Sequence, residues 1–339
     1  MKPIHLLFLC ILFSCNQKSV ETASTQRVNE KRFMKLAGVE QYVEITGSAD
    51  TLPVLLFIHG GPGWPQTPML RYFNSDLVKD LIVATWDQRG CGKTLENDST
   101  IANITLEQIV EDAHELTGFL RARFKKEKIF LAGFSWGSVV GMELLRKYPG
   151  DYLAYAGISQ VVNTSKGMEA TQKWLKEKAT AANDTASLSV LTQLERKDSL
   201  LCKTSLNCFI KQYELVSRYN GAVFDKASEK EVEKAMTAYD DYRNYDWNRG
   251  FFHSATNLEP AVFSADFTGI TSLPVPVFFF SGRHDWNIPA VLVEEFYQRL
   301  DAPRKELIWF EKSGHGPLEE EPALFNRMLK EKFLGILKP

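Results

Sequence analysis

Three residues of this sequence have the types and the order needed for nucleophilic catalysis. Ser135 is the central residue of a Gly-Phe-Ser-Trp-Gly pentapeptide, Asp285 ends a Gly-Arg-His-Asp stretch, and His315 lies in Ser-Gly-His-Gly. A serine hydroxyl is a weak nucleophile unless a base takes its proton, and the base needs a carboxylate to orient it. The order Ser, Asp, His predicts Ser135 as the nucleophile, Asp285 as the orienting acid and His315 as the base.

Other residues could take two of these roles. His284 is the neighbour of Asp285 and is a second candidate base, but His315 lies alone on its loop after the last predicted strand and is favoured. Asp241 and Asp246 are weaker candidates for the acid, because both fall in a predicted helical region.

Acyl transfer also requires N–H donors for the negatively charged oxygen of the transition state. The loop His-Gly-Gly-Pro-Gly at 59–63 follows a predicted strand and could supply one donor from Gly60 or Gly61, of which we choose Gly61. The backbone N–H of Trp136, next to the nucleophile, is the second predicted donor.

The elements that must position these residues alternate between short apolar runs and helical patterns. Continuous apolar runs of four to six residues are typical of central strands that are covered on both faces. The runs are 54–58, 81–86, 129–132, 154–158, 277–280 and 307–310. Helical spacing separates several of them, at 106–124, 139–148, 291–300 and 322–334, which predicts an α/β protein with a mostly parallel sheet.

One long stretch interrupts the alternation. Residues 161–269 contain no strand-like run but carry many Lys, Glu and Ala residues with apolar residues at helical spacing. We interpret 161–269 as a helical cap that is inserted into a core formed by 32–160 and 270–339.

The first residues predict export. Residues 4–13 form an almost unbroken apolar run behind Lys2, too short for a permanent membrane span. Together with the Leu-Phe-Ser-Cys that ends at Cys15, the run resembles a bacterial lipoprotein signal at 1–15. We therefore expect a lipid anchor on Cys15, a polar tether at 16–31, and a periplasmic or cell-surface location at the membrane.

Composition argues against several other classes of function. The formal net charge of −2 argues against nucleic-acid binding, and the six scattered histidines give no support to a metal site. No cofactor is expected. In an oxidising compartment Cys202 and Cys208 could close a small disulfide loop.

Taken together, the loops resemble those of the prolyl iminopeptidase branch of the α/β-hydrolase superfamily. The matching stretches are 59–63, 86–94, 133–138, 282–285 and 314–315. The resemblance implies an α/β-hydrolase fold, with helices on both faces of the sheet and an inserted helical cap. It also implies a metal-free serine aminopeptidase that releases N-terminal residues, preferably proline, from small peptides.

The resemblance further implies acidic side chains in the cap that bind the free amino group of the substrate. The tryptophan-rich setting in which the family's cap glutamate usually lies is missing here, and Glu214 is the nearest local match. Asp87 and Arg89, in the 86–94 stretch, are expected to form an ion pair and loop hydrogen bonds below the site. The run Glu319-Glu320-Glu321 is expected to be a solvated helix start.

Large aromatic side chains could line an apolar pocket for a proline ring or an acyl chain, although each is individually more typical of packing. They are Trp64, Trp136, Trp247, Phe251 and Phe252. Three functions are therefore open: a prolyl-type aminopeptidase, an esterase or other acyl hydrolase on the same scaffold, and a catalytically idle binding lipoprotein. The sequence assigns no oligomeric state.

Overall fold

The computed structural model describes residues 26–102, 104–195 and 205–338, and within them eight strands form one sheet. The strand order is β1-β2-β4-β3-β5-β6-β7-β8, with β1, β2 and β4 paired antiparallel and every other neighbouring pair parallel. The strands are β1 (Val28–Leu36), β2 (Val39–Gly47), β3 (Val54–Ile58), β4 (Ile82–Trp86), β5 (Ile129–Phe134), β6 (Tyr152–Ile158), β7 (Val277–Gly282) and β8 (Lys305–Phe310). The predicted α/β fold with a mostly parallel sheet is confirmed.

Helices cover both faces of the sheet, which explains why its central strands are apolar throughout. Alternate residues of a strand point to opposite faces: in β3, Val54, Leu56 and Ile58 belong to one hydrophobic cluster, and Leu55 and Phe57 belong to the other. The first cluster is closed by α3 (Leu106–Arg123), α4 (Trp136–Lys147) and α10 (Ala290–Arg299), and the second by α1 (Thr67–Phe73), η1 (Ser75–Lys79) and α12 (Pro322–Ile336).

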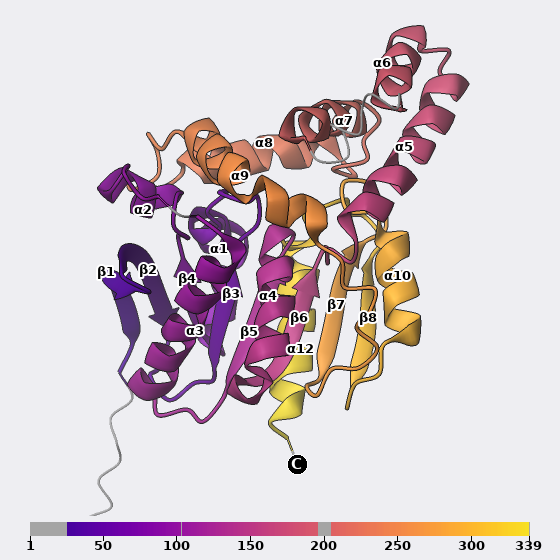
Figure 1. The fold of residues 1–339 in the computed structure, drawn as a ribbon. Coiled ribbons are helices and arrows are strands. Elements are labelled where there is room, and N and C mark those ends of the chain that lie inside the picture. Colours follow the sequence, from indigo (N-terminus) through magenta and orange to yellow (C-terminus); the bar gives the residue numbers. More distant parts are fainter. Residues whose placement is uncertain (1–25, 103, 196–204, 339) are drawn as a thin grey trace, which may run out of the picture.

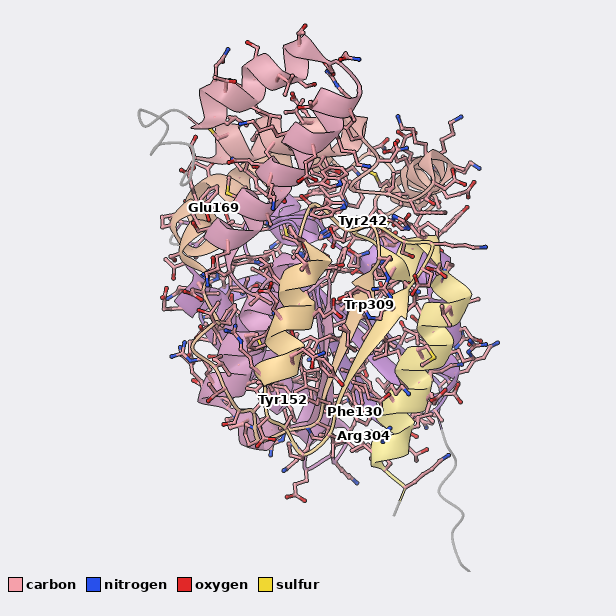
Figure 2. All side chains as sticks on the ribbon, turned by 90° about the vertical axis from the view of Figure 1, so that its right-hand side faces the viewer. Phe130, Tyr152, Glu169, Tyr242, Arg304 and Trp309 are labelled. Atoms are coloured by element: carbon pink, nitrogen blue, oxygen red, sulfur yellow. The ribbon has the colours of Figure 1, made fainter. Side chains whose placement is uncertain are left out.

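Five described helices lie between β6 and β7 in the chain and form the cap at one end of the sheet (Figure 1). They are α5 (Thr164–Ala181), α6 (Thr185–Glu195), α7 (Leu206–Arg218), α8 (Lys226–Thr237) and α9 (Trp247–Ser264). Figure 2 shows Tyr242 at the level where the cap meets the core, whereas Phe130 and Tyr152, near the starts of β5 and β6, lie at the far end of the strands. The cap therefore faces the ends of the parallel strands at which the predicted site residues emerge.

The predicted tether at 16–31 is partly wrong. β1 begins at Val28, which is buried and pairs with Gly47, so 28–31 belong to the sheet. Most side chains between the two ends of β1 are at least partly exposed, and this polar edge strand has the composition of a linker. Residues 1–25, which include the predicted signal and Cys15, lie outside the described residues.

Two short helices, α2 (Gly92–Asn97) and α11 (Pro317–Glu320), complete the described elements near the site. None of the helices in the described ranges is long and apolar enough to cross a membrane.

Candidate active site

Ser135 occupies a sharp turn between β5 and α4. Its backbone φ of 52° lies in a region that non-glycine residues seldom adopt, and the side chain is 8% exposed. The turn is possible because Gly137 packs against β3, where an added Cβ would lie 2.2 Å from the carbonyl oxygen of Ile58. This geometry presents Ser135 at the N-terminus of α4, as a nucleophile in this fold requires.

Asp285 and His315 are brought together by the loops that follow β7 and β8. His315 Nδ1 lies 2.9 Å from Asp285 Oδ2, while Asp285 Oδ1 accepts hydrogen bonds from the backbone N–H groups of Asn287 and Ile288, at 2.9 and 2.8 Å. These three bonds fix the carboxylate, which is nearly buried. With its Nδ1–H donated to Asp285, the imidazole keeps Nε2 free to accept a proton.

The imidazole lies against the nucleophile turn. The rings of His315 and Phe134, the residue before Ser135, have centroids 5.2 Å apart. Ser159, which directly follows β6, donates a hydrogen bond of 2.7 Å to the His315 carbonyl oxygen. The described structure thus gathers the predicted nucleophile, base and acid at the ends of β5, β8 and β7.

Charge sets the basicity of His315. Burial lowers the pKa of the imidazole, but the negative charges of Asp285, Glu319 and Glu320 and the hydrogen bond to Asp285 outweigh it, so the pKa is raised above its ordinary value. The alternative base, His284, instead has its ring centroid 4.7 Å from that of Phe224.

The alternative acids are engaged elsewhere. Asp246 caps α9 by accepting from Arg249 N at 2.9 Å, and Asp241 forms an ion pair with Arg71 at 2.8 Å.

The loop predicted to hold the oxyanion stands directly beside Ser135. A Cβ added to Gly60 would lie 3.2 Å from the Ser135 Cβ, so this loop and the nucleophile turn are in contact. Gly61 follows with a φ of 108°. Trp136 is the first residue of α4, so its backbone N–H has no acceptor within the helix. Both predicted donors thus border the nucleophile turn.

Gln88 joins this loop to α4. Its backbone N–H donates to His59 Nε2 at 3.2 Å, its side-chain amide donates to the His59 carbonyl oxygen at 3.2 Å, and its Oε1 accepts from Trp136 Nε1 at 3.1 Å. Burial lowers the pKa of His59 to about 4, so its ring is neutral at pH 7 and can accept at Nε2 while Nδ1 donates to the Gly60 carbonyl oxygen. Gln88 therefore holds the 59–63 loop in one position relative to the start of α4.

The predicted ion pair between Asp87 and Arg89 is wrong. Arg89 forms two buried hydrogen bonds of 2.6 Å with Asp112 on α3. Asp87 accepts instead from Tyr242 of the cap at 2.7 Å and from the Lys93 backbone at 2.8 Å. Burial raises the Asp87 pKa to about 7, because neither contact is with a full charge.

A cap segment lies on the two loops that carry Asp285 and His315. In the segment 221–224, between α7 and α8, the carbonyl oxygen of Gly221 accepts from Trp286 N at 2.8 Å and that of Ala222 accepts from His315 N at 2.7 Å. Glu320 binds the segment from the core, because its carboxylate accepts from Phe224 N and from Gly314 N, both at 2.7 Å.

The expectation of a solvated acidic run at 319–321 is therefore wrong. Glu320 bridges two loops, and Glu321 Oε2 accepts from Lys312 N at 2.9 Å and from the Ser313 hydroxyl at 2.8 Å. Glu319 accepts from Gln66 Nε2 at 2.7 Å. All three carboxylates are therefore held by hydrogen bonds within the protein: Glu321 by the loop itself, Glu320 by the loop and the cap, and Glu319 by Gln66.

The remaining predicted residues differ in their exposure to solvent. Glu214 is exposed on α7. Among the aromatic candidates, Trp64 and Trp247 pack on each other with ring centroids 5.0 Å apart, Trp136 is buried and bonded to Gln88, and Phe252 is exposed. Trp64, Trp136 and Trp247 thus each have a packing or bonding partner within the protein.

The predicted disulfide between Cys202 and Cys208 involves only one residue that the structure describes. Cys208 on α7 is disulfide-bonded, but Cys202, its predicted partner, lies outside the described residues. Cys91 is free and buried. In the part of the chain that the structure describes, no group of three or more His, Cys, Asp or Glu side chains could hold a metal ion.

Sequence reasoning assigned no role to Gln66, Gln88, Ser159 or Tyr213. Tyr213, on α7, is 43% exposed as a residue, yet partial burial of its hydroxyl and the charges of Glu229, Glu319 and Asp285 raise its pKa. Tyr213 is therefore a cap residue close to the site, next in sequence to the predicted Glu214. Gln88 lies in the matching stretch 86–94, whereas the other three lie outside the matching stretches.

The sheet, the turn at Ser135 and the inserted cap define a hydrolase of the α/β-hydrolase fold. Solved structures of that fold agree: a proline iminopeptidase-related protein from Thermus thermophilus has a TM-score of 0.61 at 20% identity, covering 91% of this chain and 98% of its own. An esterase from Exiguobacterium antarcticum has a TM-score of 0.59 at 18% identity, covering 90% and 99%.

Sequence similarity specifies the family. Residues 72–322 match a protein family that is described as "Serine aminopeptidase, S33". A probable aminopeptidase of Bacillus subtilis, YbaC, is 31% identical over 87% of this chain and 93% of its own, and a proline iminopeptidase of Thermoplasma volcanium is 25% identical over 88% and 95%. The chain belongs to the serine aminopeptidase S33 family, and the resemblance to prolyl iminopeptidases is confirmed at that level.

Proposed function

We propose that the protein is a serine aminopeptidase that releases N-terminal residues, preferably proline, from small peptides. The observation that carries the proposal is the hydrogen bond between His315 and Asp285 next to the strained turn at Ser135. Membership of the aminopeptidase family supports the choice of substrate. The preference for proline rests on the likeness to proline iminopeptidases.

In the proposed mechanism, Ser135 Oγ attacks the carbonyl carbon of the first residue while His315 Nε2 takes the hydroxyl proton. Asp285 holds the imidazole in the required tautomer and stabilises its positive charge. The N–H groups of Gly61 and Trp136 donate to the oxyanion.

The first acyl transfer ends when the C–N bond breaks and His315 passes its proton to the leaving amine. Water then attacks the acyl-enzyme with His315 again as the base, which releases the amino acid and restores the Ser135 hydroxyl.

Two substrates test this proposal. Hydrolysis of an N-terminal-proline arylamide by the wild-type protein, abolished in Ser135→Ala, is the expected result. Turnover of a short acyl ester without turnover of any aminoacyl arylamide would contradict it and would favour the esterase function. Absence of Ser135 labelling by a fluorophosphonate would contradict both and leave the binding lipoprotein.

We also propose that the protein is exported and anchored to a bacterial membrane by lipid on Cys15. Labelling of the full chain with an alkyne fatty acid in bacteria, lost in Cys15→Ser, is the expected result. Unlabelled full chain would contradict the anchor without affecting the catalytic proposal.

A further inference from the structure

Three consecutive glutamates, Glu319 to Glu321, follow the predicted base, and two of them have hydrogen-bond donors on both sides of the site or within the loop. Glu320 and Glu321 each accept two hydrogen bonds from backbone or hydroxyl donors. Glu319 accepts one side-chain hydrogen bond, from Gln66 Nε2, at its Oε1. Its Oε2 has no hydrogen bond in the described structure, so one of the three carboxylates has unused acceptor capacity.

The charge of Glu319 is also poorly compensated. Burial raises the pKa of this carboxyl group, against the opposing effects of the Gln66 hydrogen bond and the charge of His315. No Lys or Arg within the described ranges forms an ion pair with it. A desolvated carboxylate with one neutral donor gains most from a cation that brings its own hydrogen-bond donors.

Gln66 supplies a second acceptor at the same place. Its side chain is 2% exposed, and because Nε2 faces Glu319, the Oε1 of the same carboxamide is buried with no hydrogen-bond partner in the described structure. Buried polar atoms are normally paired, so this orphaned oxygen indicates a missing donor. The pair Gln66 and Glu319 therefore has one free neutral acceptor and one free charged acceptor.

The pair lies inside the predicted active site. Gln66 comes five residues after Gly61, on the segment that leaves the oxyanion loop, and Glu319 comes four residues after His315. Glu319 is close enough to His315 for the two charges to shift each other's pKa, and Tyr213 of the cap responds to Glu319 and Asp285 alike. A group bound by Glu319 would thus lie beside the reacting carbonyl.

We infer that Glu319, assisted by Gln66, binds the protonated N-terminal amino group of the substrate. An N-terminal ammonium group carries only donors, and the secondary ammonium of proline has two, which matches the two free acceptors. This inference rests on the proposed aminopeptidase function and names its specificity-determining residue. It moves amine recognition from the cap, where Glu214 is exposed, to the loop that carries the base.

Binding to an inactive protein tests the inference without requiring turnover. In a Ser135→Ala background, we would measure by calorimetry the Kd of the dipeptide Pro-Ala and of its N-acetylated form, which lacks the charged amine. The expected result is a preference for the free amine that falls about tenfold to a hundredfold on Glu319→Gln, the range for a hydrogen bond to a charged group. Glu233→Gln, which removes an exposed carboxylate on α8, is the matched control and should leave the preference unchanged.

Two results would overturn the inference: a preference that survives Glu319→Gln, or equal affinity of the wild-type site for both dipeptides. Turnover assays distinguish these two results from a failure of the proposed aminopeptidase function. An enzyme that hydrolyses a short ester but no aminoacyl arylamide lacks the proposed activity whatever the Kd values are.

Kinetics of the active enzyme distinguish binding of the amine by Glu319 from an indirect effect of Glu319 on His315. If Glu319 acts only by tuning His315, Glu319→Gln should change kcat/KM for the ester and for the arylamide by the same factor, and that outcome also contradicts recognition. If it binds the amine, the ratio of kcat/KM for the arylamide to kcat/KM for the uncharged ester should fall about tenfold to a hundredfold, whatever change the variant causes in ester hydrolysis itself. Unchanged fluorophosphonate labelling of Ser135 in the variant would show that the site is assembled.

Discussion

Gln88 is joined to His59 by two hydrogen bonds, one from its backbone N–H to the ring and one from its side-chain amide to the His59 carbonyl oxygen. The same side chain accepts from the Trp136 indole. Gln88 therefore links the two backbone segments that are proposed to bind the oxyanion, without being a proposed donor itself.

Replacement of Gln88 by Leu should lower kcat by about tenfold to a hundredfold with little change in KM, because misplaced donors fail mainly in the transition state. Steady-state kinetics on an ester and on an arylamide measure this effect. An increase of KM alone would indicate that Gln88 serves substrate binding instead. Thermal unfolding of the variant checks that the loop is still folded.

Asp285→Asn should lower kcat by about 10⁴-fold while substrate affinity is retained, because an Asn amide would favour the wrong tautomer of His315. Asp246→Asn is the matched control. That carboxylate caps α9, and Asn is an equally good capping residue, so rate and stability should both be unchanged. A normal rate in Asp285→Asn would mean that another group orients the base.

The acid limb of kcat/KM should report the raised pKa of His315. The base must be neutral, so activity should fall as the pH drops through a value above the ordinary 6.5. Removing the charge of Glu319 with Glu319→Gln lowers that pKa and should shift the limb to lower pH. An uncharged ester is the substrate for this profile, since its own ionisation cannot contribute. A limb that does not move would mean that the Glu319 charge does not reach the imidazole.

Stability should also depend on pH through Asp87. Its carboxyl group keeps its proton up to a pH of about 7 in the folded protein but releases it near 3.8 when unfolded, so the folded state binds more protons between these values. The free energy of unfolding therefore falls as the pH rises across this window.

Asp87→Asn should make that slope shallower, as measured by urea unfolding at several pH values. A residual slope is expected, because burial also raises the pKa of Glu320 to about 7. Asp240→Asn, at an exposed position, provides the comparison. The same slope in Asp87→Asn as in the wild type would contradict the assigned pKa.

The buried pair of Arg89 and Asp112 gives a prediction on stability alone. Asp112→Ala leaves a guanidinium buried without its counter-charge and should reduce the free energy of unfolding by about 3 to 5 kcal/mol. Chemical denaturation measures the loss. The double variant Arg89→Met with Asp112→Ala should recover part of it, and no recovery would mean that the loss comes from packing.

The strands and the residues proposed for catalysis could be predicted because their signals are local in sequence. Apolar runs such as Val54–Ile58 indicate buried strands by themselves, and the turn at Ser135 is encoded within five residues. Asp285 and His315 follow strands that a parallel sheet must bring to the same edge.

Contacts between distant segments could not be predicted in this way. Gln66 and Glu319 are 253 positions apart, and nothing in either neighbourhood indicates the other. The error at Arg89 has a recognisable cause. Asp87 is its neighbour in sequence, whereas its partner in the structure, Asp112, falls on the apolar face of α3 beside Ile109 and Ala113. A lone acidic residue on such a face is a signal that a buried cation should pair with it.

The hydrogen bonds of the segment 221–224 restrict how a substrate can enter. Because Ala222 accepts from the backbone of His315 and Gly221 from that of Trp286, any cap motion that lifts this segment removes supports of the base and of the loop that carries the acid. Opening wide enough to admit a folded protein would thus remove one backbone hydrogen bond from each of His315 and Trp286. Entry of a large substrate therefore competes with one of the hydrogen bonds that hold His315, which favours small substrates over folded proteins.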